Sequence, residues 1–169
     1  MRNLPDWYPK NLNSVILIIA IHTAMELIII GALAGTTAMT IFSYAISASF
    51  RKLYKEPLLL QFVISRLGIQ LNGNTLKVLA WAIHYAIGIF FAIGYHYAVA
   101  ILQPDNPWLT AALFGGIIGI LGIIGWKTMF ALSGKPRQTD AGGYYAQLFI
   151  AHVIFAAVVV SIHAISDVY

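Results

Sequence analysis

A chain of 169 residues in which 60 % are hydrophobic and only 9 % are charged is not a water-soluble domain, because such domains carry about 25 % charged residues. The absence of cysteine excludes disulfides, iron–sulfur clusters, haem thioether links and thiol catalysis. The formal charge of +4 comes from basic residues in loops beside apolar runs, which indicates membrane topology and no nucleic-acid partner.

Four apolar runs predict an all-α fold, a polytopic transmembrane helical bundle with four spans. Backbone groups in hydrocarbon are satisfied only in helices or closed barrels, and these runs are longer than barrel strands of about 9–11 residues. The predicted spans are residues 15–50, 76–102, 108–133 and 144–168, with a short interfacial helix at about 57–69. All belong to a single transmembrane domain, residues 1–169.

The first run, residues 15–50, is longer than one span requires. As a single helix it would extend about 54 Å at 1.5 Å per residue, against a hydrocarbon core of about 30 Å. Three interpretations remain open. The run forms one long tilted helix, or an interfacial helix followed by a span, or two half-spans hinged at Gly31–Gly35.

The basic residues predict the orientation of the bundle. Five Lys and Arg residues lie between positions 51 and 77, three lie between 127 and 143, and the turn at 103–107 has none. Cytoplasmic loops collect Lys and Arg, so we expect both long loops inside. The turn and both termini are then outside the cytoplasm.

Two spans carry faces of small residues that allow helix backbones to approach closely. Gly115, Gly119 and Gly122 share one face of the third span, and Gly31 and Gly35 form a similar motif on the first. Packing within the chain is one interpretation of these faces. A homodimer, or a larger complex within the bilayer, is the other.

All five histidines lie in or at the ends of the spans, where polar groups are costly and tend to mark sites. His84 and His152 each lie about 12 Å from the inner boundary by helix rise, and form an inner pair on two parallel helices. We predict a ligand or proton site there, with Tyr95 as its third residue. An outer group comprises His22, Glu26, His96, His163 and Asp167.

Two histidines that face each other from parallel helices are the usual axial ligands of b-type haems in membranes. His152 and His163 share a helix face, whereas the residue on the face of His84 is Tyr95 and not His96. An arrangement of two haems, one above the other, that would carry electrons across the membrane is thereby excluded. A single haem b between His84 and His152 remains a hypothesis.

A divalent metal is the second hypothesis for these side chains. His22 and Glu26 are spaced i, i+4, as are His163 and Asp167, and with His96 they would form a zinc, iron or manganese site where three helices converge.

Glu26 also suggests a small proton- or metal-linked solute or ion carrier that works as a dimer. The remaining interpretation is that the histidines bond across helices and hold the bundle in register.

Three segments resemble an uncharacterised family of small bacterial four-helix integral membrane proteins. They are Gly35-Thr-Thr-Ala-Met-Thr-Ile-Phe-Ser-Tyr44, His84-Tyr-Ala-Ile-Gly88 and Gln147-Leu-Phe-Ile-Ala-His152. The resemblance implies a bacterial inner membrane and a four-helix fold, and it implies no activity. Phosphate-binding loops and hydrolase motifs are absent, so we predict no catalytic residues. We expect a non-catalytic structural or accessory membrane protein, with the carrier as the alternative and a haem electron carrier third.

Overall fold

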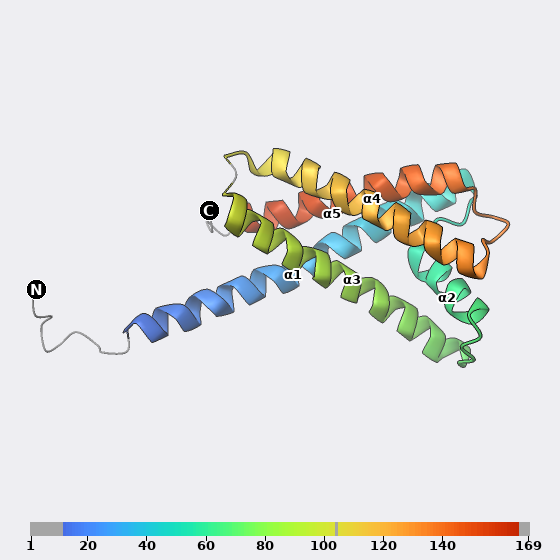
Figure 1. Ribbon diagram of the computed structural model, residues 1–169, viewed down its shortest axis with the longest axis horizontal. Helices are drawn as coiled ribbons and strands as arrows, with labels where there is room; N and C mark the ends of the chain where they lie inside the picture. The colour runs from blue at the N-terminus through green and yellow to red at the C-terminus, as the bar shows by residue number, and fades with distance from the viewer. Residues whose placement is uncertain (1–11, 104, 166–169) are drawn as a thin grey trace, which may run out of the picture.

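The computed structural model of the protein describes residues 12–103 and 105–165, and these form helices joined by short loops (Figure 1). Four helices are long and apolar enough to cross a membrane, so the predicted all-α bundle with four spans is confirmed. The elements are α1 (Leu12–Phe50), α2 (Glu56–Arg66), α3 (Gly73–Leu102), α4 (Pro107–Ser133) and α5 (Ala141–Ile165).

The helix ends follow local signals in the sequence. Asn72 precedes α3 and its side chain accepts the N–H of Thr75 at 2.9 Å. Asn106 precedes α4 and accepts the N–H groups of Trp108 and Leu109 at 3.0 and 3.1 Å. These contacts satisfy amide groups that have no partner within the helix. Pro107, which has no N–H to satisfy, occupies the first position of α4.

The first apolar run forms one continuous helix, and the two interpretations that divide it are wrong. α1 has 39 residues, which corresponds to about 58 Å. Its N-terminal part extends away from the other helices (Figure 1), and Val15, Ile16, Leu17, Ile18 and Ile19 are all exposed there.

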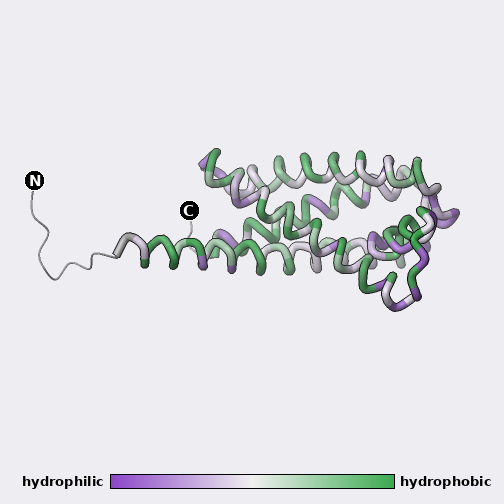
Figure 2. The backbone as a smooth tube through the Cα atoms, turned by 60° about the horizontal axis from the view of Figure 1, so that its bottom comes forward, coloured by the Kyte–Doolittle hydropathy of each residue, from purple (hydrophilic) through white to green (hydrophobic). Residues whose placement is uncertain are grey.

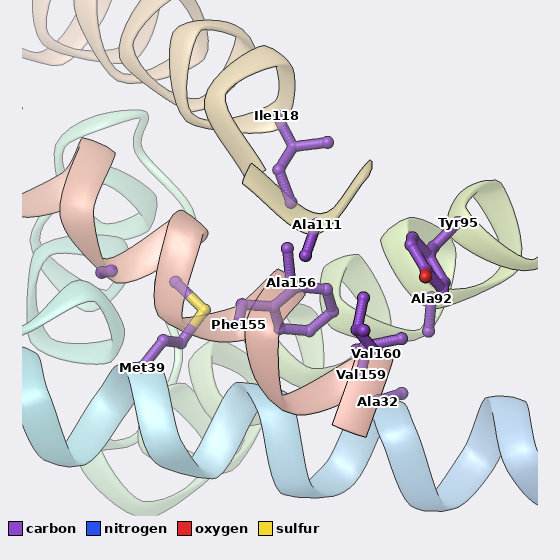
Figure 3. Packing of buried hydrophobic residues seen from close by; sticks show 11 residues of the cluster. Ala32, Met39, Ala92, Tyr95, Ala111, Ile118, Phe155, Ala156, Val159 and Val160 are labelled. Atoms are coloured by element: carbon purple, nitrogen blue, oxygen red, sulfur yellow. The ribbon is translucent and has the colours of Figure 1, made fainter. Parts of the chain in front are cut away.

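The core of the bundle forms around α5, which packs against both α1 and α4. Phe155, Ala156, Val159 and Val160 are fully buried. Figure 3 shows them between Ala32 of α1 and Ala111 of α4. α3 packs on α1 and on α2.

Most of the polar loops lie at one end of the molecule, as the hydropathy colouring of Figure 2 shows. We call this the α2 end; it carries α2 and the loops at residues 51–55 and 134–140. The opposite end carries the turn between α3 and α4, and we call it the turn end. α2 is attached by buried Leu59, Leu60, Val63 and Ile64, which pack with Trp126 and neighbouring side chains.

Both faces of small residues are occupied by α5 of the same chain. A Cβ atom at Gly35 would lie 2.8 Å from Cδ2 of Phe155, and one at Gly115 would lie 2.8 Å from Cα of Val153. Gly31, Gly119 and Gly122 likewise face Val159, Phe149 and His152. These glycines therefore serve packing within the chain.

Candidate functional site

A cavity of about 280 Å³ lies within the half of the bundle nearer the α2 end, and all five helices contribute to its lining. Its polar lining residues are Glu56, His84 and His152. The remaining walls are apolar or glycine and include Met39, Leu60, Ile83, Gly88, Phe91, Gly122, Trp126, Met129 and Leu148. No Lys or Arg side chain is among the residues that line it.

The cavity opens sideways, between α3 and α4. Ile87 of α3 and Leu121 of α4 line it, and these two side chains are 43 % and 54 % exposed on the flank of the bundle. In a membrane this flank faces lipid. Molecules that dissolve in the bilayer therefore have a direct route to the polar groups.

Glu56, the first residue of α2, has a carboxyl group that is almost completely buried, with 2 % of the residue exposed. Its Oε1 atom lies 2.9 Å from Oγ of Ser43 and accepts a hydrogen bond from Nε2 of Gln147 at 3.3 Å. Its Oε2 atom has no hydrogen-bond partner among the described residues. Burial raises the pKa of Glu56 to about 7, although the hydrogen bonds that its carboxylate form would accept from its own backbone, Ser43 and Gln147 act in the opposite direction.

The hydrogen-bond inventory at Ser43 shows why the neutral acid suits this site. Oγ of Ser43 lies 2.9 Å from the carbonyl oxygen of Met39, 2.9 Å from Oε1 of Glu56 and 2.5 Å from Nε2 of Gln147. The hydroxyl has one proton, and the Met39 carbonyl is only an acceptor. A protonated Glu56 donates to Ser43 and lets all three contacts be hydrogen bonds at once, whereas the carboxylate competes with Met39 for the Ser43 proton.

His84 is held by α1. Its Nε2 atom lies 2.9 Å from Oγ1 of Thr40, and the Thr40 hydroxyl donates its only proton to the carbonyl of Thr36 at 2.6 Å. Nε2 of His84 is therefore the donor in this pair. The lone pair of the neutral ring then lies on Nδ1, which has no hydrogen-bond partner among the described residues.

His152 has the opposite tautomer. Its Nδ1 atom lies 2.7 Å from the carbonyl oxygen of Leu148 on the same helix, so Nδ1 carries the proton and Nε2 carries the lone pair. Gly122 makes room for this ring, since a Cβ there would lie 2.8 Å from Cε1 of His152. The two histidines thus each present a lone-pair nitrogen in the lining of one cavity and do not bond to each other.

The residues do not fit a haem ligated by both rings through Nε2. That atom of His84 is already bonded to Thr40 at 2.9 Å, and turning the ring would break this hydrogen bond between α3 and α1.

The outer residues fall into two separate places. The His163 ring centroid lies 5.4 Å from that of Tyr95 and 5.9 Å from that of His96, whereas His22 and Glu26 are exposed on the N-terminal part of α1. Asp167 lies outside the described residues. Within residues 12–103 and 105–165, no three His, Cys, Asp or Glu side chains are placed to hold a metal ion.

An aromatic layer separates the cavity from this outer cluster. The Phe91 ring centroid lies 5.8 Å from that of His152 and 6.4 Å from that of Phe155. Phe155 and Val159 are fully buried. The polar groups of the cavity are therefore closed off toward the turn end, and the exposed part of the lining lies between α3 and α4.

Glu56 is the residue that the sequence analysis does not identify, because it lies directly before the predicted interfacial helix at about 57–69. An acidic residue beside Pro57 is common in the first turn of an exposed helix. The signal in the sequence is the run Pro57-Leu-Leu-Leu60 directly after it, which is unusually apolar for the start of a solvated helix.

Comparison with known protein families, with curated protein sequences and with solved structures finds no match. The geometry of the site is therefore the basis for the proposed function.

Proposed function

We propose that this chain is a multi-pass protein of the bacterial inner membrane that binds a small amphiphilic amine in the cavity and exchanges it for a proton on Glu56. The observation that supports this proposal is the buried carboxyl, one oxygen of which has no partner among the described residues. Buried polar atoms without partners are rare in folded proteins and call for a functional explanation. In a small carrier of the kind that the sequence suggests, the binding of a ligand from the bilayer is the first step of transport.

The chemistry of the cavity selects the class of ligand. The carboxylate of Glu56 and the lone pairs of His84 and His152 are all acceptors, and no basic side chain lines the cavity. A protonated amine supplies both the positive charge and up to three N–H donors. The faces of Trp126 and Phe91 suit an apolar or aromatic body attached to that amine.

A structural or accessory role is the second candidate, and one specific contact favours it. The hydrogen bond of 2.9 Å between His84 and Thr40 joins α3 to α1, and bonds of this kind stabilise membrane helices by about 0.6 kcal/mol on average. In that case His84→Ala lowers stability by this small amount and changes no binding property.

The proposed function is tested with three probes of similar shape and the protein in lipid nanodiscs. Benzylammonium has charge and donors, benzyltrimethylammonium has charge without donors, and ethylbenzene has neither. We expect benzylammonium to bind best at pH 8 and about tenfold more weakly at pH 6, because the proton competes for Glu56 with a pKa of about 7. Calorimetry in buffers of different ionisation enthalpy measures the accompanying release of protons.

Glu56→Gln is expected to abolish both the binding of benzylammonium and its pH dependence, because the variant has the shape of the acid without its charge. Glu26→Gln, which changes an exposed carboxylate on α1, serves as the matched control and leaves binding unchanged. Equal binding of ethylbenzene and benzylammonium would contradict the proposal. So would full binding by the Glu56→Gln variant.

The proposed orientation has a separate test, which uses the absence of native cysteine. Asp105 and Gln138 are exposed at the turn end and at the α2 end, respectively. We expect Asp105→Cys to react with an impermeant thiol reagent added outside intact cells, and Gln138→Cys to react only after the cells are opened. The reverse pattern shows that the basic loops lie outside.

A further inference from the structure

A second hollow, a groove of about 550 Å³ whose lining includes Gln147, lies between α1 and α5 at the α2 end. Its walls are the apolar side chains of Phe42, Ile46 and Phe50 from α1, with Ile150 from α5. Phe50 and Ile150 are 65 % and 49 % exposed. These walls belong to spans, so the groove faces the hydrocarbon of the bilayer.

The groove ends in two charged groups of opposite sign. Lys52 and Asp140 both line it and both are exposed. Tyr54 donates its hydroxyl to Oδ1 of Asp140 at 2.6 Å, and the N–H of Gly143 donates to Oδ2 at 2.8 Å. These bonds, the one from Tyr54 first, hold the pKa of Asp140 below its usual range, with a smaller contribution from Lys52.

The two charges are held in place by contacts between the loops that carry them. Leu53 donates its N–H to the carbonyl of Gln138 at 3.1 Å, and its own carbonyl accepts the hydroxyl of Thr139 at 2.8 Å. Gly143 allows the close approach, since a Cβ there would lie 2.6 Å from Oδ2 of Asp140. The carboxylate of Asp140 is thus fixed at the rim of the groove, and the backbone of Lys52 is held next to it by the bond of its N–H to the carbonyl of Ser47 at 3.1 Å.

We infer that the groove binds a phospholipid with an ethanolamine head, its phosphate at Lys52, its ammonium at Asp140 and an acyl chain along the apolar wall. The charge pattern of the rim selects this lipid. A headgroup with phosphate alone leaves Asp140 facing a like charge. A choline head has the two charges but lacks N–H donors, and a carboxylate gains most from charged donors.

The test is native mass spectrometry of the purified protein with phosphatidylethanolamine, phosphatidylcholine and phosphatidylglycerol that carry identical acyl chains. We expect one phosphatidylethanolamine molecule to be retained about tenfold more tightly than either of the others, as one charge-assisted hydrogen bond allows. Equal retention of the three lipids overturns the inference.

Two variants test the roles of Asp140 and Lys52 independently. Asp140→Asn keeps an oxygen for Tyr54 and is expected to abolish the preference for ethanolamine over choline. Lys52→Gln is expected to weaken the retention of all three lipids. Arg137→Gln is the matched control, because it removes an exposed charge from the same end outside the lining of the groove.

The fold of each variant is checked by its thermal unfolding, so that a loss of lipid is not mistaken for a loss of structure. An Asp140→Asn variant that is folded and keeps the full preference overturns the inference. A stable dimer that retains no lipid also overturns it, because a second copy then covers the groove. Neither result bears on the binding of amines at Glu56.

Discussion

Wild-type protein is expected to lose about 3 kcal/mol of unfolding free energy, relative to Glu56→Gln, as the pH rises from 5 to 8. The pKa of Glu56 in the folded protein is about 7, against an ordinary value of 4.5. Between these values the folded protein holds a proton that the unfolded chain has released, so its stability falls with pH. Each pKa unit corresponds to about 1.4 kcal/mol.

The measurement is reversible unfolding in mixed micelles at pH 5, 6, 7 and 8 for both proteins. Other titratable groups lie nearby, namely His84, His152 and Tyr144, and their contributions cancel to first order in the difference between the two curves. Glu26→Gln is the control, and its curve should run parallel to that of the wild type. A constant difference between wild type and Glu56→Gln across the whole range would show that Glu56 does not titrate there.

Gly115→Ala is expected to destabilise the bundle by about 1–3 kcal/mol, the usual effect of adding a methyl group to a filled core. The new Cβ would lie 2.8 Å from Cα of Val153 and 3.1 Å from Cβ of Ala156. The first of these atoms belongs to the backbone of α5, so the two helices have to separate.

Gly116→Ala is the matched control, since it makes the same chemical change one residue further along α4. Its Cβ would meet Cζ of Phe149 at 3.7 Å, an ordinary van der Waals distance. We expect this variant to unfold within about 0.5 kcal/mol of the wild type, as measured in mixed micelles. Similar losses for the two variants would mean that the contact between α4 and α5 is loose.

The spans were predictable because a bilayer imposes a length and a composition on every helix that crosses it. The depth of His84 and His152 followed from helix rise, and the structure places both in the lining of one cavity. The partners of these rings did not follow, because Thr40 lies 44 positions from His84 along the chain. Such contacts depend on helix rotation, which a uniformly apolar helix leaves unspecified.

Glu56 shows the same limit more strongly. Its environment is made by Ser43 and by Gln147, which lies 91 positions away, and by the way in which α2 folds back against α3 and α4. No periodicity within residues 51–72 carries that information. The depth of a residue in a membrane can be predicted by counting along one helix. The burial of a residue outside the spans can be predicted only when the packing of the whole bundle is known.

The length of α1 makes the protein sensitive to bilayer thickness. The apolar part of α1 has 37 residues, against 25 for α5. At a tilt of about 40°, the upper end of the usual range, those 37 residues still cover about 43 Å, roughly the full bilayer with its headgroups. Thin membranes therefore strain α1 through hydrophobic mismatch before they strain α5, and longer lipid chains relieve that strain.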